Sequence, residues 1–255
     1  KMLAKMIKPD TRLWMMTGTP ASQSPEDAFG LARLVSPHKV PKYSTAWRDK
    51  VMTQISRFKW SPKPYAKDLV FDALQPAIRF EKKDCLDLPE VTHLDRDAPL
   101  TPQQMKYYKL LKERMTMVAA GEEVSAVNAA TNINKLLQIS GGAVYSDTGE
   151  VVEFDVSNRL KIVQEVIDEA SHKVLVFVPF THTIELLRAY LQKHGITCDV
   201  INGKVPVNKR HEIIQAFQTT DKTRVLIIQP QAASHGLTLT AANVVIWYAP
   251  VTSVE

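Results

Sequence analysis

Four short segments of small, polar and glycine residues follow apolar runs in the second half of the chain. They are Pro179–His182, Asn202–Lys204, Gln229–Gly236 and Ala249–Thr252. If the apolar runs are parallel strands, these segments lie at their carboxyl ends, where open α/β sheets bind ligands. Gly236 would let the backbone approach a phosphate closely, because it has no Cβ. These segments are therefore the candidate binding loops.

A fifth candidate is the turn Thr17-Gly18-Thr19-Pro20, which follows the apolar run Arg12–Met16. We expect that run to be a short strand. Small hydroxyl residues on a tight turn at a strand end expose backbone amides and side-chain oxygens. Such a turn can relay a signal from a phosphate site, although four residues alone are equally compatible with an ordinary turn.

Residues that would perform chemistry directly are absent or misplaced. No G-x-x-x-x-G-K-[ST] phosphate loop occurs, and Gly203-Lys204 lacks both the first glycine and the final hydroxyl. Asp168-Glu169 and His172 fit D-E-x-x-H, but the preceding apolar spacing predicts a solvated last turn of a helix. The seven histidines and two cysteines show no metal-ligand spacing. We therefore predict no metal site and no catalytic residue within this sequence.

Positive charge is concentrated in the first third of the chain. Residues 1–90 hold 16 Lys and Arg against 10 Asp and Glu, a surplus of six, whereas residues 91–255 hold 16 against 17. Within residues 38–67, eight cations, including Lys59, Lys63 and Lys67, alternate with aromatic residues. This pattern is typical of a surface that binds a nucleic-acid backbone and stacks on bases. It fits equally well a solvated lysine-rich face over a small aromatic core.

The second part of the chain alternates helix and strand patterns. Helical spacing of apolar residues is expected over 157–170 and 184–191 and for a helix that carries Ile213, Ile214 and Phe217. Strands are expected over 173–178, 196–201, 224–228 and 244–248. Strands rich in Val, Ile and Leu that alternate with helices predict an α/β fold with a parallel sheet covered on both faces. The charged, proline-containing segment 88–99 is a plausible linker, followed by a helix that begins at the capping box Thr101-Pro102-Gln103-Gln104.

Composition excludes several classes of protein. With 255 residues and 45% hydrophobic content, the chain can bury a large core and is not a disordered segment. Its longest apolar runs are far shorter than the roughly 20 residues of a membrane helix. Cys85 and Cys198 are expected to be buried small hydrophobes in a reducing compartment. We expect an intracellular protein, cytoplasmic or nucleoid-associated.

Five motifs in order resemble one family. They are Thr17–Pro20, the segment Leu74–Pro89 followed by Leu100–Gln104, strand 174–178, the Asn202-Gly203 turn with Arg210, Ile214 and Phe217, and Val225–Ile228 running into Ala232–Ala242. The set resembles the Swi/Snf-like family of superfamily 2 helicases and DNA translocases over essentially the whole chain. Its segment Ser234-His235-Gly236-Leu237 looks closest to the fifth motif of bacterial and phage-type members.

The resemblance implies two RecA-like lobes that clamp ATP and Mg²⁺ between them and move along DNA. Residues 1–90 would be the C-terminal part of the first lobe with a basic helical insertion, and residues 91–255 most of the second lobe. The phosphate loop, the acidic box and the arginine finger would lie outside this sequence. The chain alone is therefore expected not to hydrolyse ATP. Other parts of the parent protein would make most of the contacts with ATP.

The resemblance also assigns roles to individual residues. Thr17, Gly18, Thr19 and Pro20 would couple nucleotide state to lobe closure, and His235 and Gly236 would face the nucleotide. DNA contacts would come from Phe180, Gly203, Gln229, Ser234 and Thr238. Separately from the resemblance, the charge pattern of the basic segment predicts further contacts from Lys59, Lys63 and Lys67. Relatives carry a small hydroxyl residue near Gln229-Pro230-Gln231, so the contact at this strand end is left open, as is a packing role for His235.

Two other functional classes remain open at this point. A non-catalytic nucleic-acid-binding module would use the 38–67 segment alone. A flavodoxin-like or small-molecule α/β enzyme would bind its cofactor at the same strand ends, and a flavin would be visible in the absorption spectrum.

Overall fold

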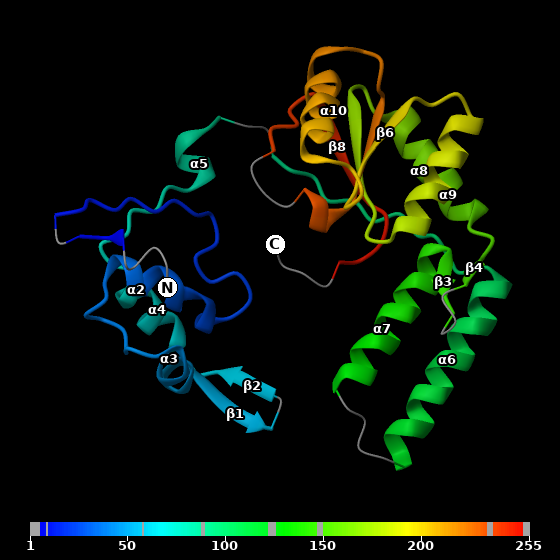
Figure 1. The fold of residues 1–255 in the computed structure, drawn as a ribbon. Helices are drawn as coiled ribbons and strands as arrows, with labels where there is room; N and C mark the ends of the chain where they lie inside the picture. Colours follow the sequence, from blue (N-terminus) through cyan, green and yellow to red (C-terminus); the bar gives the residue numbers. More distant parts are fainter. Residues whose placement is uncertain are drawn as a thin grey trace. The chain divides into compact units, whose positions relative to one another are not determined.

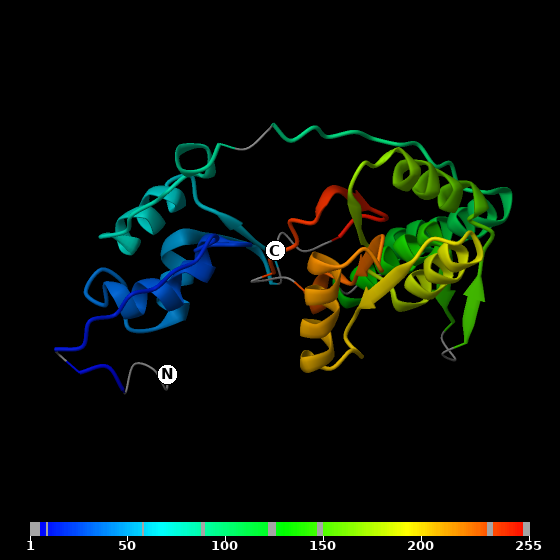
Figure 2. The same ribbon diagram turned by 90° about the horizontal axis from the view of Figure 1, so that it is seen from above.

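The fold is described from a computed structural model that places residues 6–8, 10–57, 59–87, 90–121, 126–146, 150–233 and 237–251 (Figure 1). The chain divides into two compact units, the first ending at Thr92 and the second beginning at His93. Residues 90–101 between them form neither helix nor strand and follow an extended path (Figure 2).

The first unit is a small helical body with one β-hairpin. Its elements are η1 (Pro25–Ala28), α2 (Phe29–Val35), α3 (Ser44–Val51), β1 (Met52–Ser56), β2 (Lys59–Pro62), α4 (Ala66–Leu74) and α5 (Lys82–Cys85). The Asp27 carboxylate accepts the N–H of Ser24 at 2.8 Å, which caps the start of η1 as the sequence predicts. Trp47 is fully buried at the centre of the core, and its indole N–H donates to the carbonyl of Pro25 at 3.2 Å.

The strand expected at Arg12–Met16 is not formed. No described residue pairs with this segment, and it lies in the solvent, with Trp14 86% and Met16 98% exposed. A strand requires a neighbour for its backbone hydrogen bonds, and none of the described segments supplies one. The strands of the described first unit are the antiparallel pair β1 and β2, which the sequence analysis did not predict.

The second unit contains the predicted parallel sheet. Its strands are β5 (Lys173–Phe177), β6 (Cys198–Ile201), β7 (Val225–Ile228) and β8 (Ala242–Trp247), in the order β6-β7-β5-β8, and every pairing is parallel. Helices α8 (Ser157–Glu169) and α9 (Thr181–Lys193) lie on one side of the sheet and α10 (Val207–Thr219) on the other (Figure 1). The predicted α/β class is thus confirmed, and the carboxyl ends of four strands share one edge.

Two cores fill the space between these layers. On the α8 and α9 side, Ile184 and Leu187 are fully buried against Val174 and Val176 of β5. On the α10 side, Phe217 is fully buried against Leu226 and Ile228 of β7. Helix periodicity predicted the residues of both cores, because each helix presents one apolar stripe to a sheet.

Coverage of both faces was expected along the whole sheet, but it fails at β8. Val245 and Trp247 are 50% and 57% exposed, and the burial of β8 alternates along its length. β8 is an edge strand, and no described helix lies over its α10-side face. The indole of Trp247 instead stacks on Phe177, with ring centroids 4.5 Å apart.

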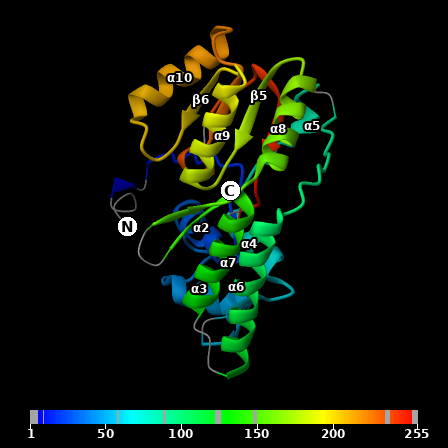
Figure 3. The ribbon, with the colours of Figure 1, turned by 90° about the vertical axis from the view of Figure 1, so that its right-hand side faces the viewer.

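A long helical hairpin precedes the sheet in the sequence. Helices α6 (Pro102–Gly121) and α7 (Ala126–Gly141) pack side by side and are followed by the short antiparallel pair β3 (Ala143–Tyr145) and β4 (Val151–Glu153) (Figure 3). The Gln104 side chain is 1% exposed; its Oε1 accepts from Thr101 and its Nε2 donates to the carbonyl of Ile139 at 2.7 Å. The apolar spacing of α6 predicts Met105 on the apolar face of this helix, but Met105 is exposed and Gln104 is buried.

Two further findings concern expectations from composition. None of the helices in the described part of the chain is long and apolar enough to cross a membrane. Both cysteines are free, but Cys85 is exposed on α5 and Cys198 only partly buried. The expectation of two buried cysteines was therefore wrong for Cys85, because α5 packs into no described core cluster.

Candidate nucleic-acid interface at the carboxyl edge of the sheet

The loops that follow β5, β6 and β7 are held together by one side chain, Gln229. Its Oε1 accepts the N–H of Gly203 at 3.1 Å, and its Nε2 donates to the carbonyl of Pro179 at 3.3 Å. Gln229 was predicted to contact DNA, but both ends of its amide bind protein here. In the structure Gln229 therefore connects the carboxyl ends of β5, β6 and β7.

The turn after β6 is ordered by its own residues. The side chain of Asn202 accepts the N–H of Lys204 at 3.0 Å, and its carbonyl accepts the N–H of Val205 at 3.2 Å. The Gly203 N–H is occupied by Gln229, and a Cβ at Gly203 would meet only the Gln229 oxygen at 3.8 Å. The exposed group at this turn is Lys204, which no described acid pairs with.

The other predicted DNA contacts in this unit differ in their surroundings. Phe180 is partly buried at the start of α9, and its ring packs against Gly141 of α7. Thr238 is exposed beyond β7. Ser234, His235 and Gly236, which were predicted to face the nucleotide or the DNA, lie outside the described residues.

Sequence reasoning passed over two cations at this edge. Lys204 was treated as part of a failed phosphate loop, although a lysine in a turn directly after a buried strand is itself a signal for a phosphate contact. Arg210 was noted as part of a motif and given no role. Its guanidinium binds three backbone carbonyls of the loops after β6 and β7.

In the first unit, the turn Thr17–Pro20 is exposed throughout. The Oγ1 of Thr17 accepts the N–H of Thr19 at 3.2 Å, which closes a small hydroxyl turn. A Cβ added at Gly18 would meet nothing within 4 Å, so neither sterics nor a left-handed backbone requires glycine there. The coupling role of this turn stays a prediction.

The basic segment of residues 38–67 contains both kinds of structure that its sequence allowed. Trp47 and Trp60 belong to the core cluster of the first unit, and the Arg48 guanidinium lies 4.7 Å from the Trp60 ring centroid. Tyr43 and Tyr65 remain exposed, at 64% and 52%. The segment is therefore a small aromatic core with cations and two tyrosines on its surface.

The three lysines proposed as DNA contacts in this segment are not equivalent. Lys59 and Lys67 are exposed, whereas Lys63 is partly buried and donates from Nζ to the Asp49 carbonyl at 2.6 Å. Lys63 and Lys67 both line a hollow of about 290 Å³ beside Ser24 and Pro25.

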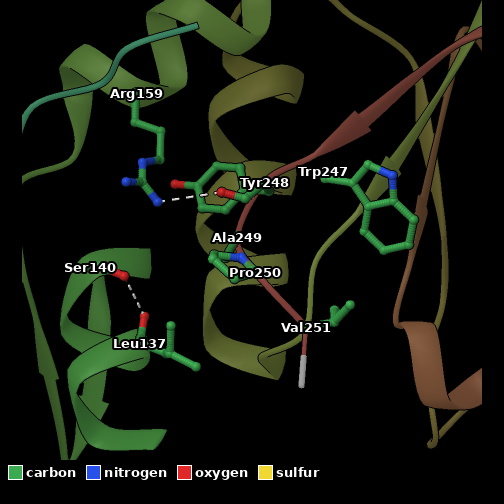
Figure 4. Close-up of a pocket in the computed structure, with 8 residues that line it drawn as sticks. All are labelled: Leu137, Ser140, Arg159, Trp247, Tyr248, Ala249, Pro250 and Val251. Carbon is green, nitrogen blue, oxygen red and sulfur yellow. Dashed lines mark hydrogen bonds between the residues drawn. The ribbon is translucent and has the colours of Figure 1, made fainter. Parts of the chain in front are cut away.

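A larger pocket of about 590 Å³ lies at the same edge of the sheet as the loops (Figure 4). It is lined by Leu137 and Ser140 of α7, by Arg159 of α8, and by residues 247–251 after β8. The Arg159 guanidinium lies 5.4 Å from the centroid of the Tyr248 ring and donates to the Tyr248 carbonyl at 3.4 Å. Arg159 is the single charged side chain among the residues that line the pocket.

The Tyr248 hydroxyl is buried without a hydrogen-bond partner among the described residues, and burial raises the pKa of this phenol to about 12. A phenol with a raised folded-state pKa contributes stability that is complete below about pH 10 and is lost as pH rises towards 12. We expect Tyr248→Phe to remove an alkaline loss of about 2–3 kcal/mol between these values. At pH 8 it should leave stability unchanged or higher, because it deletes an unpaired buried group.

Urea unfolding of both proteins at pH 8, 10 and 11.5 measures this effect. Other groups that titrate above pH 9 affect both proteins alike, so the difference between the two curves isolates Tyr248. Parallel curves over the whole range would show that the Tyr248 hydroxyl is not buried as described.

The described residues do not by themselves fit an Mg²⁺–ATP site. They contain no group of three or more His, Cys, Asp or Glu side chains placed to hold a metal ion. Asp168 and Glu169 lie in the last turn of α8, as the sequence predicted, and Glu169 accepts from Arg96 at 2.7 Å. No step of ATP hydrolysis is therefore assigned to these residues.

Comparison with known proteins supports the resemblance seen in the sequence. Residues 158–255 match the profile of the helicase conserved C-terminal domain. Chromodomain-helicase-DNA-binding protein 1-like from Danio rerio is 23% identical over 250 residues, covering 91% of this chain and 23% of that protein. Putative protein p41 from Acyrthosiphon pisum secondary endosymbiont phage 1 is 23% identical over 265 residues, covering 96% of this chain and 53% of that protein.

Solved structures give the same fold. The Sulfolobus solfataricus SWI2/SNF2 ATPase core in complex with dsDNA has a TM-score of 0.53 and 21% identity, covering 85% of this chain and 47% of that chain. The core domain alone has a TM-score of 0.52 and 19% identity, covering 88% and 48%. The chain thus spans between about a quarter and about half of the length of these proteins. Residues 158–255 thus match a helicase conserved C-terminal domain, and the resemblance of the chain to the Swi/Snf-like family of superfamily 2 is confirmed.

Proposed function

We propose that this chain is part of an ATP-driven DNA helicase or translocase, in which the carboxyl edge of the β6-β7-β5-β8 sheet holds the DNA backbone. The observation that carries the proposal is the common edge itself. Four parallel strands end there, and the loops after three of them, β5, β6 and β7, are cross-linked by Gln229, with Lys204 exposed at the β6 end. A cation in an ordered turn suits a phosphate contact that is independent of base sequence.

Similar proteins support the assignment. An uncharacterized ATP-dependent helicase from Mycoplasma pneumoniae is 26% identical over 173 residues, covering 67% of this chain and 16% of that protein. The SWI2/SNF2 ATPase core of similar fold was solved with duplex DNA. We infer that the parent protein uses ATP and Mg²⁺, bound mainly by residues other than those described here, and that it acts on DNA in the cytoplasm or at the nucleoid.

In this proposal the first unit is the end of one RecA-like lobe and the second unit is most of the other. Thr17–Pro20 would couple nucleotide state to closure of the lobes, His235 and Gly236 would contribute to nucleotide binding, and Ser234 would contribute to the DNA contact. ATP would favour the closed arrangement and hydrolysis would release it, so that each cycle shifts the grip on the backbone. Lys59 and Lys67 would add phosphate contacts from the first unit.

Duplex binding by the 255-residue chain tests the proposal. We expect a labelled 20-base-pair duplex to bind and its affinity to fall at least about tenfold between about 50 and about 200 mM salt. Two phosphate contacts correspond to a slope near −1.8 in log affinity against log salt, which gives about this loss. Fluorescence anisotropy measures it. Absence of binding at low salt, or an affinity that salt does not change, would contradict the proposal.

A further inference from the structure

Arg210 joins two of the strand-end loops through a single guanidinium. Its Nε donates to the carbonyl of Val205 at 2.8 Å, one terminal nitrogen donates to the carbonyl of Ala232 at 2.9 Å, and the other donates to the carbonyl of Asn202 at 3.2 Å. Asn202 and Val205 belong to the loop after β6, and Ala232 to the loop after β7. Because the guanidinium is planar and rigid, these three bonds fix the spacing of the two loops.

Gln229 makes the complementary connection from the other side. Its amide ties the β6 loop at Gly203 to the β5 end at Pro179, as described above. The two side chains thus hold the loops after β5, β6 and β7 as one unit. Three of the five N–H donors of Arg210 and one of the two of Gln229 bind protein carbonyls, and both side chains are only partly exposed. These bonds within the protein compete with a direct contact to a DNA backbone.

We propose that Arg210 and Gln229 are positioning residues that preorganise the strand-end loops for the DNA backbone and do not themselves contact it. The inference rests on the proposed function of this edge. Loops already fixed before binding lose less conformational freedom when they meet the phosphates, which strengthens binding without adding a contact. The groups that meet the phosphates are then those left free, with Lys204 the described cation among them.

A positioning role of Arg210 can be distinguished from a contribution to the stability of the whole second unit. Arg210 lies in the first turn of α10, while this helix is anchored to the sheet by Phe217, Ile213 and Ile214 further along. Loss of the guanidinium should therefore loosen the loops and leave α10 and the sheet in place. Hydrogen exchange can distinguish the two, because it reports local and global opening separately.

The test compares Arg210→Gln and Arg210→Lys with Gln229→Leu and a matched control, Lys209→Gln. Lys209 is the neighbouring exposed cation, paired with Glu212 at 3.1 Å, so its loss removes a nearby charge without touching the loops. We expect both Arg210 variants and Gln229→Leu to bind duplex DNA about tenfold more weakly, equivalent to ordering one or two loop residues on binding. Lys209→Gln should bind within about twofold of the unmodified chain.

Two readouts identify the cause. The slope of log affinity against log salt should stay unchanged in the Arg210 and Gln229 variants, because the number of phosphate contacts is the same. Amide exchange should quicken at residues 203–205 and 232–233 and stay slow in β7. Recovery of full affinity in Arg210→Lys would show that charge alone matters, and faster exchange in β7 would show a merely structural role; either result overturns the inference.

Two further outcomes are also decisive. Loosened loops with unchanged DNA affinity would overturn the inference and leave the proposed function intact. If the unmodified chain does not bind DNA, the proposed function is wrong, and so is the inferred role of Arg210 and Gln229 in DNA binding. The exchange measurements would still decide whether Arg210 holds the two loops together.

Discussion

Replacing Phe217 with alanine is expected to lower the free energy of unfolding of the second unit by about 3–5 kcal/mol. The side chain is fully buried between α10 and the β6-β7 side of the sheet, where Leu226 and Ile228 surround it. The Phe217 ring also contacts a cation. The Lys173 ammonium lies 5.0 Å from the ring centroid and donates a hydrogen bond to the Phe217 carbonyl. Truncation therefore leaves a cavity and removes the cation's ring partner.

The consequence for function is indirect. Because α10 carries Arg210, loss of its anchor should also release the loops after β6 and β7. Amide exchange in β7 measures the global opening of the second unit. Ile213→Val is the matched control, since Ile213 is only partly buried on the same helix and should cost about 1 kcal/mol. A Phe217→Ala chain as stable as this control would show that α10 is not packed as described.

The fold of the second unit could be predicted from the sequence because its apolar residues follow the local periodicity of helices and strands. Helices α8, α9 and α10 each present an apolar stripe, and the strands between them are nearly continuous in Val, Ile and Leu. Glycine, which tolerates the left-handed backbone that ends many helices, follows α7 at Gly142 and α9 at Gly195, with φ of 115° and 73°. The order of helix and strand then required a parallel sheet with its candidate loops at one edge.

Features that depend on partners could not be predicted in this way. Arg12–Met16 has the composition of a strand, but composition does not supply the neighbouring strand that would pair with it. Met105 has the right spacing to be buried, yet Gln104 is buried because its amide finds partners at both ends. Periodicity counts apolar residues and cannot register a polar side chain whose hydrogen bonds are all satisfied.

The candidate site also contains features that depend on partners distant in the sequence. The sequence predicts a DNA contact for Gln229, but it cannot show that the Gln229 amide binds two other loops, because hydrogen bonds between loops distant in sequence are invisible in it. Gln229 meets Gly203 and Pro179 across 26 and 50 positions, and Arg210 meets Ala232 across 22. In the basic segment, Trp47 and Trp60 alternate with cations and belong to a core cluster, which is one of the two interpretations that the sequence left open.

Charge reversal at Lys204 is expected to change both the affinity and the salt dependence of DNA binding. We expect Lys204→Glu to weaken duplex binding about tenfold at moderate salt and to reduce the salt slope by about 1, as loss of one phosphate contact does. Lys222→Glu is the matched control. Lys222 is equally exposed and lies in the same unit, but in the loop before β7, at the opposite edge of the parallel sheet. The same change of net charge at that edge should leave the slope unaltered.

The comparison that decides between the two surfaces is the salt dependence of duplex affinity for Lys204→Glu, Lys222→Glu and the triple variant Lys59→Glu, Lys63→Glu, Lys67→Glu. If the carboxyl edge holds the backbone, Lys204→Glu lowers affinity and slope, Lys222→Glu does neither, and the triple variant retains binding that still depends on Lys204. If the triple variant abolishes salt-dependent binding while Lys204→Glu matches Lys222→Glu, the basic segment binds the DNA and the carboxyl edge does not.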